Sequence, residues 1–461
     1  MKRIWLKNYR CFREKQEARL APLTLLVGDN STGKTSFLAM VRALWDFAYG
    51  RQTPDFKEEP YELGSFEDIA HYRGRRTGRL ESFEGTFEFA QEQTTTSDHD
   101  RDGINQYSVV FRNLSANPVP VRWRIGNSRR WIEEHLRNDF HVDIQMGTTR
   151  GSWKYSPQFR ATHLDSVSGS ILPFLNTRPF LIQLELAQQD ITFGSRDELV
   201  PLDSSPDISS EDIGEIREIE RFREMAEPRF MKRRPFASAP VRSRPRRTYD
   251  PARPTRDPEG DHVPMYLADL YFRDKDSWER MKGALQNFGR ESGLFDEIAI
   301  RRLGKRESEP FQVQVRKFDG RSKGPSRNLI DVGYGVSQIL PVIAELLRAD
   351  APDMFLLQQP EVHLHPSAQA ALGSLFCDLA GPKRQLIVET HSDHLMDRVR
   401  MDVRDGRRQV KPEDVSILYF ERKNLDVQIH SLRLDKQGNV LGCPESYRRF
   451  FMEETKRSLG F

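Results

Sequence analysis

The chain has 461 residues, of which 30% are charged and 37% hydrophobic, and its formal net charge is +3. This length predicts two lobes or one domain with a large insertion, and the nearly balanced charge excludes nucleic-acid binding through overall charge, although local basic patches remain possible. The three cysteines are too far apart to indicate a zinc site or a disulfide framework, and no apolar run approaches the ~18 residues of a membrane span, so we expect a cytoplasmic protein outside the membrane.

Two predicted strands and a helix surround the first motif of the chain. Residues 4–12 and 20–27 are predicted as strands, and residues 36–45 have the apolar spacing of a helix. Between the second strand and the helix lies Gly28-Asp-Asn-Ser-Thr-Gly33-Lys34-Thr35, a complete GxxxxGK(S/T) loop. This context favours a phosphate-binding P-loop over an ordinary glycine-rich turn.

A P-loop binds phosphate through its backbone N–H groups and the positive end of the following helix. We therefore predict a nucleotide at this loop, with Lys34 reaching its β and γ phosphates and Thr35 ligating Mg²⁺. The other residues that we predict to bind the nucleotide here are Arg10, Asn30, Ser31, Thr32, Gly33 and Ser36.

The middle of the chain is patterned less clearly. Residues 81–90, 107–111 and 121–125 alternate with period two and predict an antiparallel sheet. Residues 126–175 have a weak pattern. A strand is predicted over 179–186 and an exposed helix over 211–230.

Residues 229–256 form a basic, proline-rich segment with ten Lys or Arg residues against one acid, Asp250. One interpretation is an arm that contacts nucleic acid, phosphate or an acidic protein, and the interleaved Phe236 and Tyr249 favour it. The other is an Arg-rich loop that neutralises nearby carboxylates. The proline content excludes a long helix in either case.

Helices are predicted next over 265–272 and 278–288, followed by strands over 297–302 and 311–318. The periodic runs are too short for a coiled-coil arm of many heptads. A long-armed chromosome-type ATPase is therefore not expected.

Three further motifs follow in the last third of the chain. Their order is Asp331-Val-Gly333-Tyr-Gly335-Val-Ser337-Gln338 before an apolar helix, then Gln358-Gln359-Pro-Glu361-Val-His-Leu-His-Pro after a buried strand, then Glu389-Thr-His391-Ser after another. Behind a P-loop, this order resembles the ABC-type ATPase heads of the RecF, structural-maintenance and overcoming-lysogenization-defect group. The resemblance covers about residues 1–125 and 296–461.

The resemblance implies an α/β fold, with a mixed central sheet and an antiparallel β lobe. The predicted domains are an N-lobe over 1–125, a mostly helical insertion over 126–295 and a C-lobe over 296–461. It also implies ATP and Mg²⁺ as cofactors and a head-to-head dimer with two composite sites. In that dimer Gly333, Gly335 and Ser337 would face the ATP of the second subunit, and His391 would donate to the γ phosphate.

One departure concerns catalysis. Gln358 and Gln359 stand where the family usually has an acidic pair, and glutamine cannot act as a general base. We predict Gln358 as a weak Mg²⁺ ligand. Glu361 lies two residues beyond Gln359 on the same side of an extended chain, so its carboxylate is predicted to polarise the attacking water. The expected activity is slow hydrolysis, and the alternative is none.

The chain stops about 70 residues after His391, which leaves no room for the Toprim nuclease that many relatives carry. It looks like stand-alone ATPases paired with a nuclease in bacterial anti-phage defence. That likeness implies a homo-oligomer of head-to-head dimers that controls a Toprim nuclease subunit and responds to an acidic, DNA-mimicking phage protein. Two alternatives remain: a DNA-repair ATPase that binds DNA directly, and a scaffold that binds ATP without hydrolysis.

Overall fold

The computed structural model describes residues 1–48, 54–73, 78–90, 104–127, 131–136, 142–148, 151–155, 233–251, 255–306, 309–320, 322–406 and 408–447. The chain divides into two compact units. The first unit contains residues 1–42, 56–64 and 231–461, and the second contains 43–55 and 65–230. The strand predicted over 179–186 and the helix predicted over 211–230 lie outside the described residues.

The first unit is built on a mixed sheet. Its strands run in the order β10 (Phe236–Ser238), β16 (Met354–Gln358), β17 (Gln385–Glu389), β3 (Leu23–Gly28), β18 (Val415–Lys423), β19 (Asp426–Leu434) and β20 (Val440–Leu441). The strands from β10 to β18 pair in parallel, whereas β19 and β20 are antiparallel. β3, β16 and β17 are buried along their whole length, as parallel strands covered on both faces are. The carboxyl ends of these strands therefore meet at one edge, where α/β sheets bind ligands.

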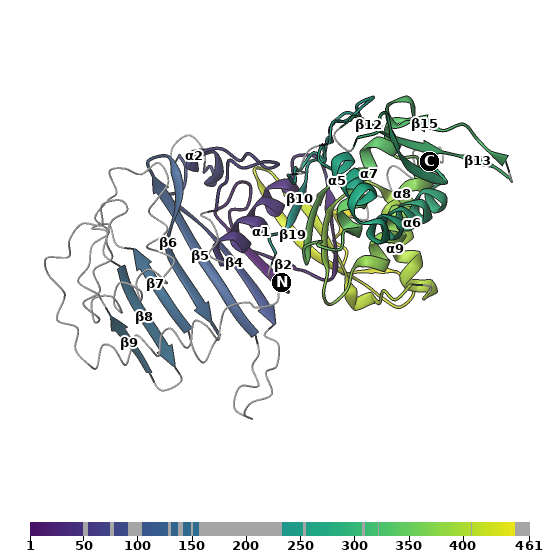
Figure 1. Ribbon diagram of the computed structural model, residues 1–461. Helices are drawn as coiled ribbons and strands as arrows, with labels where there is room; N and C mark the ends of the chain where they lie inside the picture. Colours follow the sequence, from purple (N-terminus) through teal and green to yellow (C-terminus); the bar gives the residue numbers. More distant parts are fainter. Residues whose placement is uncertain are drawn as a thin grey trace, which may run out of the picture. The chain divides into compact units, whose positions relative to one another are not determined.

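Helices cover this sheet (Figure 1). They are α1 (Lys34–Ala48), α5 (Val263–Arg273), α6 (Lys275–Ser292), α7 (Tyr334–Leu347), α8 (Pro366–Leu379) and α9 (Asp393–Asp405). One hydrophobic cluster joins residues of α5 to α9 to alternate residues of β3, β16 and β17, since successive side chains of a strand point to opposite faces. The helices predicted over 36–45, 265–272 and 278–288 are confirmed, each within a longer helix.

Smaller elements complete the first unit. β1 (Arg3–Lys7) pairs with β2 (Gln16–Arg19), and β12 (Phe311–Arg316) lies between β11 (Glu297–Arg302) and β15 (Arg327–Asn328). β13 (Phe318–Asp319) and β14 (Ser322–Lys323) form a short hairpin. Two 3₁₀ helices, η1 (Leu329–Asp331) and η2 (Pro412–Asp414), precede α7 and β18.

The first predicted strand, over 4–12, is shorter than expected. It ends at Lys7, because Asn8 and Arg10 have positive φ angles of 58° and 50° and turn the chain back. The N–H of Tyr9 then donates to the carbonyl of Phe12 at 3.0 Å. The hydroxyl of Tyr9 donates to the carbonyl of Ser36 at 2.8 Å, so this turn supports the first turn of α1.

The second unit contains an antiparallel meander (Figure 1). Its order follows the sequence: β4 (Ser82–Ala90), β5 (Ile104–Leu114), β6 (Asn117–Gly126), β7 (Trp131–Leu136), β8 (Val142–Thr148) and β9 (Gly151–Tyr155). A short helix, α2 (Phe66–Ile69), precedes it. The α/β class, with a mixed central sheet and an antiparallel β lobe, is therefore confirmed.

The two units differ from the three predicted segments. The described part of 126–295 contains β7, β8, β9 and β10 as well as α5 and α6, so it is not mostly helical. In addition, α5 and α6 belong to the first unit and share its core. Within the described residues, no helix combines the length and apolar character needed to cross a membrane.

Candidate nucleotide-binding site

The P-loop connects the end of β3 to the start of α1, and its two glycines adopt conformations that other residues rarely take. Gly28 has a φ of 140°, and a Cβ there would lie 2.5 Å from the carbonyl oxygen of Phe420. Gly33 has a φ of 85°, and its Cβ would lie 2.4 Å from the Sγ of Cys11. Glycine is therefore required at both positions, and the loop can curl around a phosphate group.

Lys34 is the first residue of α1, and its side chain is held inside the loop. Nζ donates to the carbonyl oxygens of Gly28 at 3.0 Å and Asp29 at 2.7 Å. Burial lowers the pKa of Lys34, and the carboxylates of Glu389 and Asp29 oppose this effect. The hydroxyl of Thr32 donates to the same Asp29 carbonyl at 2.8 Å. The predicted phosphate-binding cation therefore lies inside the P-loop, at the carboxyl end of β3.

Thr35 faces a carboxylate that the sequence analysis did not identify. Its hydroxyl donates to Oε2 of Glu389 at 3.0 Å. Glu389 is the last residue of β17, and strand register places it beside Leu26 of β3 and Gln358 of β16. Burial raises the pKa of Glu389, opposed by the charge of Lys34 and by hydrogen bonds from neighbouring side chains. The sequence signal for Glu389 was its position as an acidic residue at the end of a buried strand, two residues before His391.

Gln358 and Gln359 contact different neighbouring strands, β10 and β17. The Nε2 of Gln358 donates to the carbonyl of Ser238 at 3.2 Å, so its amide nitrogen faces the outermost strand of the sheet, β10. Gln359 has a φ of 41°, and its N–H donates to the carbonyl of Glu389 at 2.9 Å. The side chain of Gln359 lies near the carboxylate of Glu389 and contributes to lowering its pKa, which burial raises. The carboxylate beside Thr35 therefore comes from β17 and not from β16.

Glu361 and His391 are connected through the backbone. Glu361 is 5% exposed, and its Oε1 accepts the N–H of His391 at 2.8 Å. Burial raises the pKa of Glu361. Burial lowers the pKa of His391, and the charge of Lys34 lowers it further. The N–H of the preceding Thr390 donates at 3.1 Å to the carbonyl of Leu26 on β3, the strand that leads into the P-loop. The structure brings His391 to the P-loop and gives Glu361 a role in holding it there.

The glycine-rich turn Gly333–Ser337, called the signature-like loop below, begins α7 as predicted. Gly333 is the N-cap of the helix, and Tyr334 beside it is 58% exposed. A Cβ on Gly335 would lie 2.9 Å from the carbonyl oxygen of His363, so this helix start packs closely on the loop after β16. The hydroxyl of Ser337 is buried and donates to the carbonyl of Tyr334 at 3.0 Å. The N–H of Val336 already donates to the carbonyl of Gly333 at 3.1 Å. The N–H groups of Tyr334 and Gly335 precede the first hydrogen bonds of the helix, so they suit a phosphate better than the Ser337 hydroxyl, which is already engaged.

The tip of the P-loop is supported by residues from outside the motif. Asn30 and Ser31 are exposed, and the guanidinium of Arg422 on β18 donates to the carbonyl of Ser31. Arg10 precedes Cys11, whose Sγ lies 3.7 Å from the carbonyl of Thr32. This contact brings the backbone next to Arg10 to the loop. Arg422, which contacts the loop directly, was not predicted from the sequence.

The basic segment is largely part of the fold where the structure describes it. Arg242 is 3% exposed. Arg246 pairs with Asp261 at 2.7 Å, and Arg247 pairs with Asp331 at 2.6 Å. The two aromatic residues that favoured an exposed contact, Phe236 and Tyr249, are buried. These contacts favour the interpretation that the arginines neutralise nearby carboxylates.

The chemistry of the loop fits Mg²⁺ bound together with a nucleotide. Mg²⁺ prefers oxygen ligands and is usually held by one or two carboxylates plus substrate phosphates. The hydroxyl of Thr35 and the carboxylate of Glu389 are such ligands and lie side by side. No group of three or more His, Cys, Asp or Glu side chains suited to a metal occurs among the described residues.

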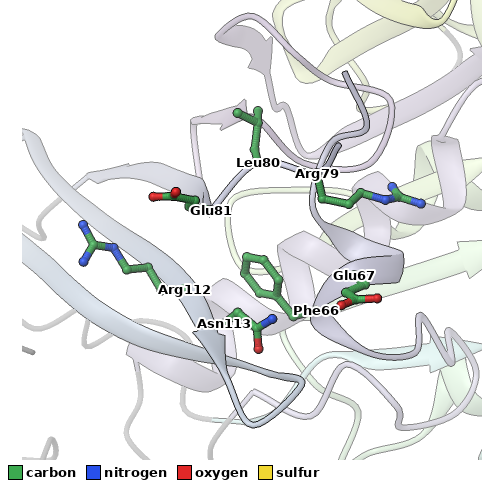
Figure 2. Close-up of a pocket in the computed structure, with 7 residues that line it drawn as sticks. All are labelled: Phe66, Glu67, Arg79, Leu80, Glu81, Arg112 and Asn113. Atoms are coloured by element: carbon green, nitrogen blue, oxygen red, sulfur yellow. The ribbon is translucent and has the colours of Figure 1, made fainter. Parts of the chain in front are cut away.

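The second unit has an open concavity of about 600 Å³. Figure 2 shows its lining side chains, which come from α2, the segment before β4 and the end of β5. The guanidinium of Arg79 donates to the carbonyl of Ala70 at 2.8 Å and lies over the ring of Tyr72, so it already has partners. None of the predicted nucleotide-binding residues lines this concavity.

Comparisons with known proteins were made with sequences and with solved structures. A family model described as "AAA domain, putative AbiEii toxin, Type IV TA system" matches residues 158–397, and one described as "AAA ATPase domain" matches residues 1–100. No curated protein matches the chain.

Similar solved structures include heads of Smc proteins, each 12% identical to this chain. A SmcHead bound to the C-winged helix domain of ScpA covers 94% of this chain and 98% of its own, with a TM-score of 0.42. A head with an extended coiled coil bound to the C-terminal domain of ScpA, derived from Pyrococcus furiosus, covers 99% of each chain with a TM-score of 0.41. The SMC head domain from Thermotoga maritima covers 93% of this chain and 98% of its own, with a TM-score of 0.36.

The first family model matches more than half of the chain, including β16, β17 and the signature-like loop. The second matches the segment that contains the P-loop. Because the first model covers more than half of the chain, these matches show that the chain belongs to the family described as "AAA domain, putative AbiEii toxin, Type IV TA system".

Proposed function

We propose that the protein binds ATP with Mg²⁺ in the cytoplasm and hydrolyses it slowly. The observation that carries this proposal is the hydrogen bond between Thr35 and Glu389 beside the side chain of Lys34. The ammonium of Lys34, the hydroxyl of Thr35 and the carboxylate of Glu389 thus lie close together at the end of β3. Bound Mg²⁺ would offset the charge of the phosphate oxygens.

The roles of the side chains follow from their positions. Lys34 and the loop N–H groups bind the β and γ phosphates, and neutral His391 donates to the γ phosphate. Gln359 orients the attacking water, as glutamine does in other nucleotide hydrolases. Glu389 lies next to Gln359 and is the best-placed carboxylate to accept the proton of that water. This proposal moves the general-base role from Glu361 to Glu389.

The activity is tested by phosphate release from ATP and Mg²⁺ with the purified full chain. We expect slow release that needs no DNA. Release that depends on added DNA would instead support a DNA-repair ATPase. Retained ATP binding without any release would support the scaffold alternative, which Gln358 and Gln359 favour.

We further propose that two copies pair head to head, with the N-terminus of α7 from one copy facing the ATP of the other. The exposed side chains of Tyr334 and Ile330, both next to the start of α7, support this surface, because neighbouring exposed apolar side chains can mark a protein contact. Replacing Tyr334 by Glu should weaken ATP-dependent dimerisation at least about tenfold, a loss of ~1.4 kcal/mol. Sedimentation with and without ATP measures this, and ATP binding by the single subunit serves as control. Unchanged dimerisation would remove Tyr334 from the interface.

At the level of the cell, we propose that such dimers build a homo-oligomeric sensor and scaffold like AriA of the PARIS anti-phage system. Its partners would be a Toprim nuclease subunit and an acidic, DNA-mimicking phage protein. The support is the combination of an ATPase core and the sequence likeness. Co-purification of an adjacent Toprim nuclease, and its release by the acidic protein, tests this proposal. A nuclease that neither binds nor responds would contradict it.

A further inference from the structure

A buried arginine connects three parts of the nucleotide site. Arg242 follows β10, and its backbone is fixed to α7 at two points. Its N–H donates to Oε1 of Gln338 at 3.1 Å, and its carbonyl accepts from Nε2 of Gln338 at 3.3 Å. Gln338 lies one turn into α7, just after the signature-like loop. The position of Arg242 is therefore coupled to that helix.

The guanidinium of Arg242 points at the loop after β16. Nη2 donates to the carbonyl of Gln359 at 3.3 Å, and Nη1 donates to the carbonyl of Pro240 at 3.2 Å. Its Nε is buried without a hydrogen-bond partner. The charge that acts on it is that of Glu361, which opposes the effect of burial in lowering the pKa of Arg242 to about 10. The side chain is thus a buried cation whose hydrogen-bond partners are backbone carbonyls.

Burying a cation in this way costs free energy, so a gain elsewhere is expected. The gain that the geometry offers is the conformation of Gln359. Its φ of 41° lies in the left-handed region, which residues other than glycine adopt at a cost and often at functional sites. The carbonyl of Glu389 holds its N–H, and Arg242 holds its carbonyl. The turn that aims the Gln359 side chain at Glu389 is therefore held from both sides.

We propose that Arg242 is a positioning residue for ATP turnover: it holds the Gln359 turn and couples that turn to the helix that begins at the signature-like loop. This inference rests on the proposed ATPase activity and adds a residue from outside its recognised motifs. A purely structural arginine would stabilise the fold without a selective effect on turnover.

The first experiment compares steady-state ATP hydrolysis by wild type, Arg242→Met and Arg242→Lys. Displacing a catalytic group by about 1 Å can cost on the order of 100-fold, so we expect Arg242→Met to lower kcat about 10- to 100-fold. KM for ATP should change less than about threefold, because the P-loop is untouched. Arg242→Lys should recover part of the loss, since an ammonium can donate to the Gln359 carbonyl. The exposed neighbour Arg244→Met is the matched control and should keep the wild-type kcat.

The opposite charges of Arg242 and Glu361 allow a second comparison. Arg242→Met leaves the carboxylate of Glu361 without its opposing charge, so Arg242→Met combined with Glu361→Gln should be more stable and turn over faster than Arg242→Met alone. Thermal unfolding confirms that each variant is folded. Wild-type kcat in folded Arg242→Met, or equal losses in kcat and ATP affinity that lysine does not relieve, would overturn the proposal.

Amide hydrogen exchange separates this inference from the proposed function. In Arg242→Met the N–H groups of Gln359 and His391 should exchange faster, while those of β3 should not change. If the wild type shows no ATP hydrolysis, the proposed function fails, and the positioning of turnover fails with it even if exchange increases. If the wild type hydrolyses ATP but neither exchange nor kcat changes in Arg242→Met, only the inference about Arg242 fails.

Discussion

Lys34→Ala is expected to abolish ATP binding. The ammonium of Lys34 already lies against the loop carbonyls of Gly28 and Asp29, at the position from which it can reach the β and γ phosphates. Each hydrogen bond to a charged group contributes about 1.5–3 kcal/mol, so the loss of two such contacts should weaken binding at least about 100-fold. Titration with a fluorescent ATP analogue measures the affinity.

The control for this variant is Lys383→Ala, which removes an exposed lysine of the same unit from the turn before β17. It should bind ATP as the wild type does. Thermal unfolding of Lys34→Ala checks that the P-loop remains folded. Folded Lys34→Ala with wild-type affinity would show that the nucleotide binds elsewhere in the protein.

The P-loop could be predicted from sequence because everything it needs is contiguous. A buried strand, two glycines with positive φ and a helix start all lie between Leu23 and Ala48. The order of the later motifs was equally informative, since each motif ends a strand of the central sheet or begins a helix that packs on it. The sequence thus indicated β3, β16, β17 and α7 and the edge of the sheet at which they meet.

Glu389 could not be assigned in the same way, because its role depends on the order of strands in the sheet. Its partner Thr35 is 354 positions away in sequence, and the two meet only because β17 lies directly beside β3. By the family resemblance, the carboxylate is expected on the strand that ends in Gln358. The local signal for Glu389 was its position at the end of a buried strand, two residues before His391, and this signal does not show that β17 lies beside β3.

Segment 229–256 shows a different limit. The composition of this segment predicts that its arginines are exposed. The carboxylates of Asp261 and Asp331 pair with Arg246 and Arg247, but the sequence does not identify them as the partners. Burial of Arg242 depends on its exchange of hydrogen bonds with Gln338, 96 positions away. In the second unit, β7 to β9 were missed because residues 126–175 lack a clear alternation, although cross-strand pairing holds them in a meander.

The carboxylate of Glu389 is expected to dominate turnover. Glu389→Gln should lower kcat about 100-fold or more, within the range that a general base contributes. The amide oxygen of glutamine can still accept the Thr35 hydroxyl, so the fold and much of the ATP affinity should remain. Glu361→Gln should cost less, because its amide oxygen can still accept the N–H of His391, the contact that Glu361 makes in the structure. Phosphate release, measured beside ATP affinity for each variant, gives the comparison.

The two variants decide between the carboxylates because they remove the same charge from two places, the end of β17 and the loop after β16. If Glu361→Gln stops hydrolysis while Glu389→Gln does not, the base is the residue predicted from sequence, and the Thr35–Glu389 contact serves only to bind Mg²⁺ or to hold β17 against α1. If Glu389→Gln weakens ATP binding in proportion to turnover, Glu389 acts in Mg²⁺ binding alone. A selective loss of kcat in Glu389→Gln is the outcome expected here, because this carboxylate, at the end of the strand next to β3, is the one that lies beside both Thr35 and Gln359 among the described residues.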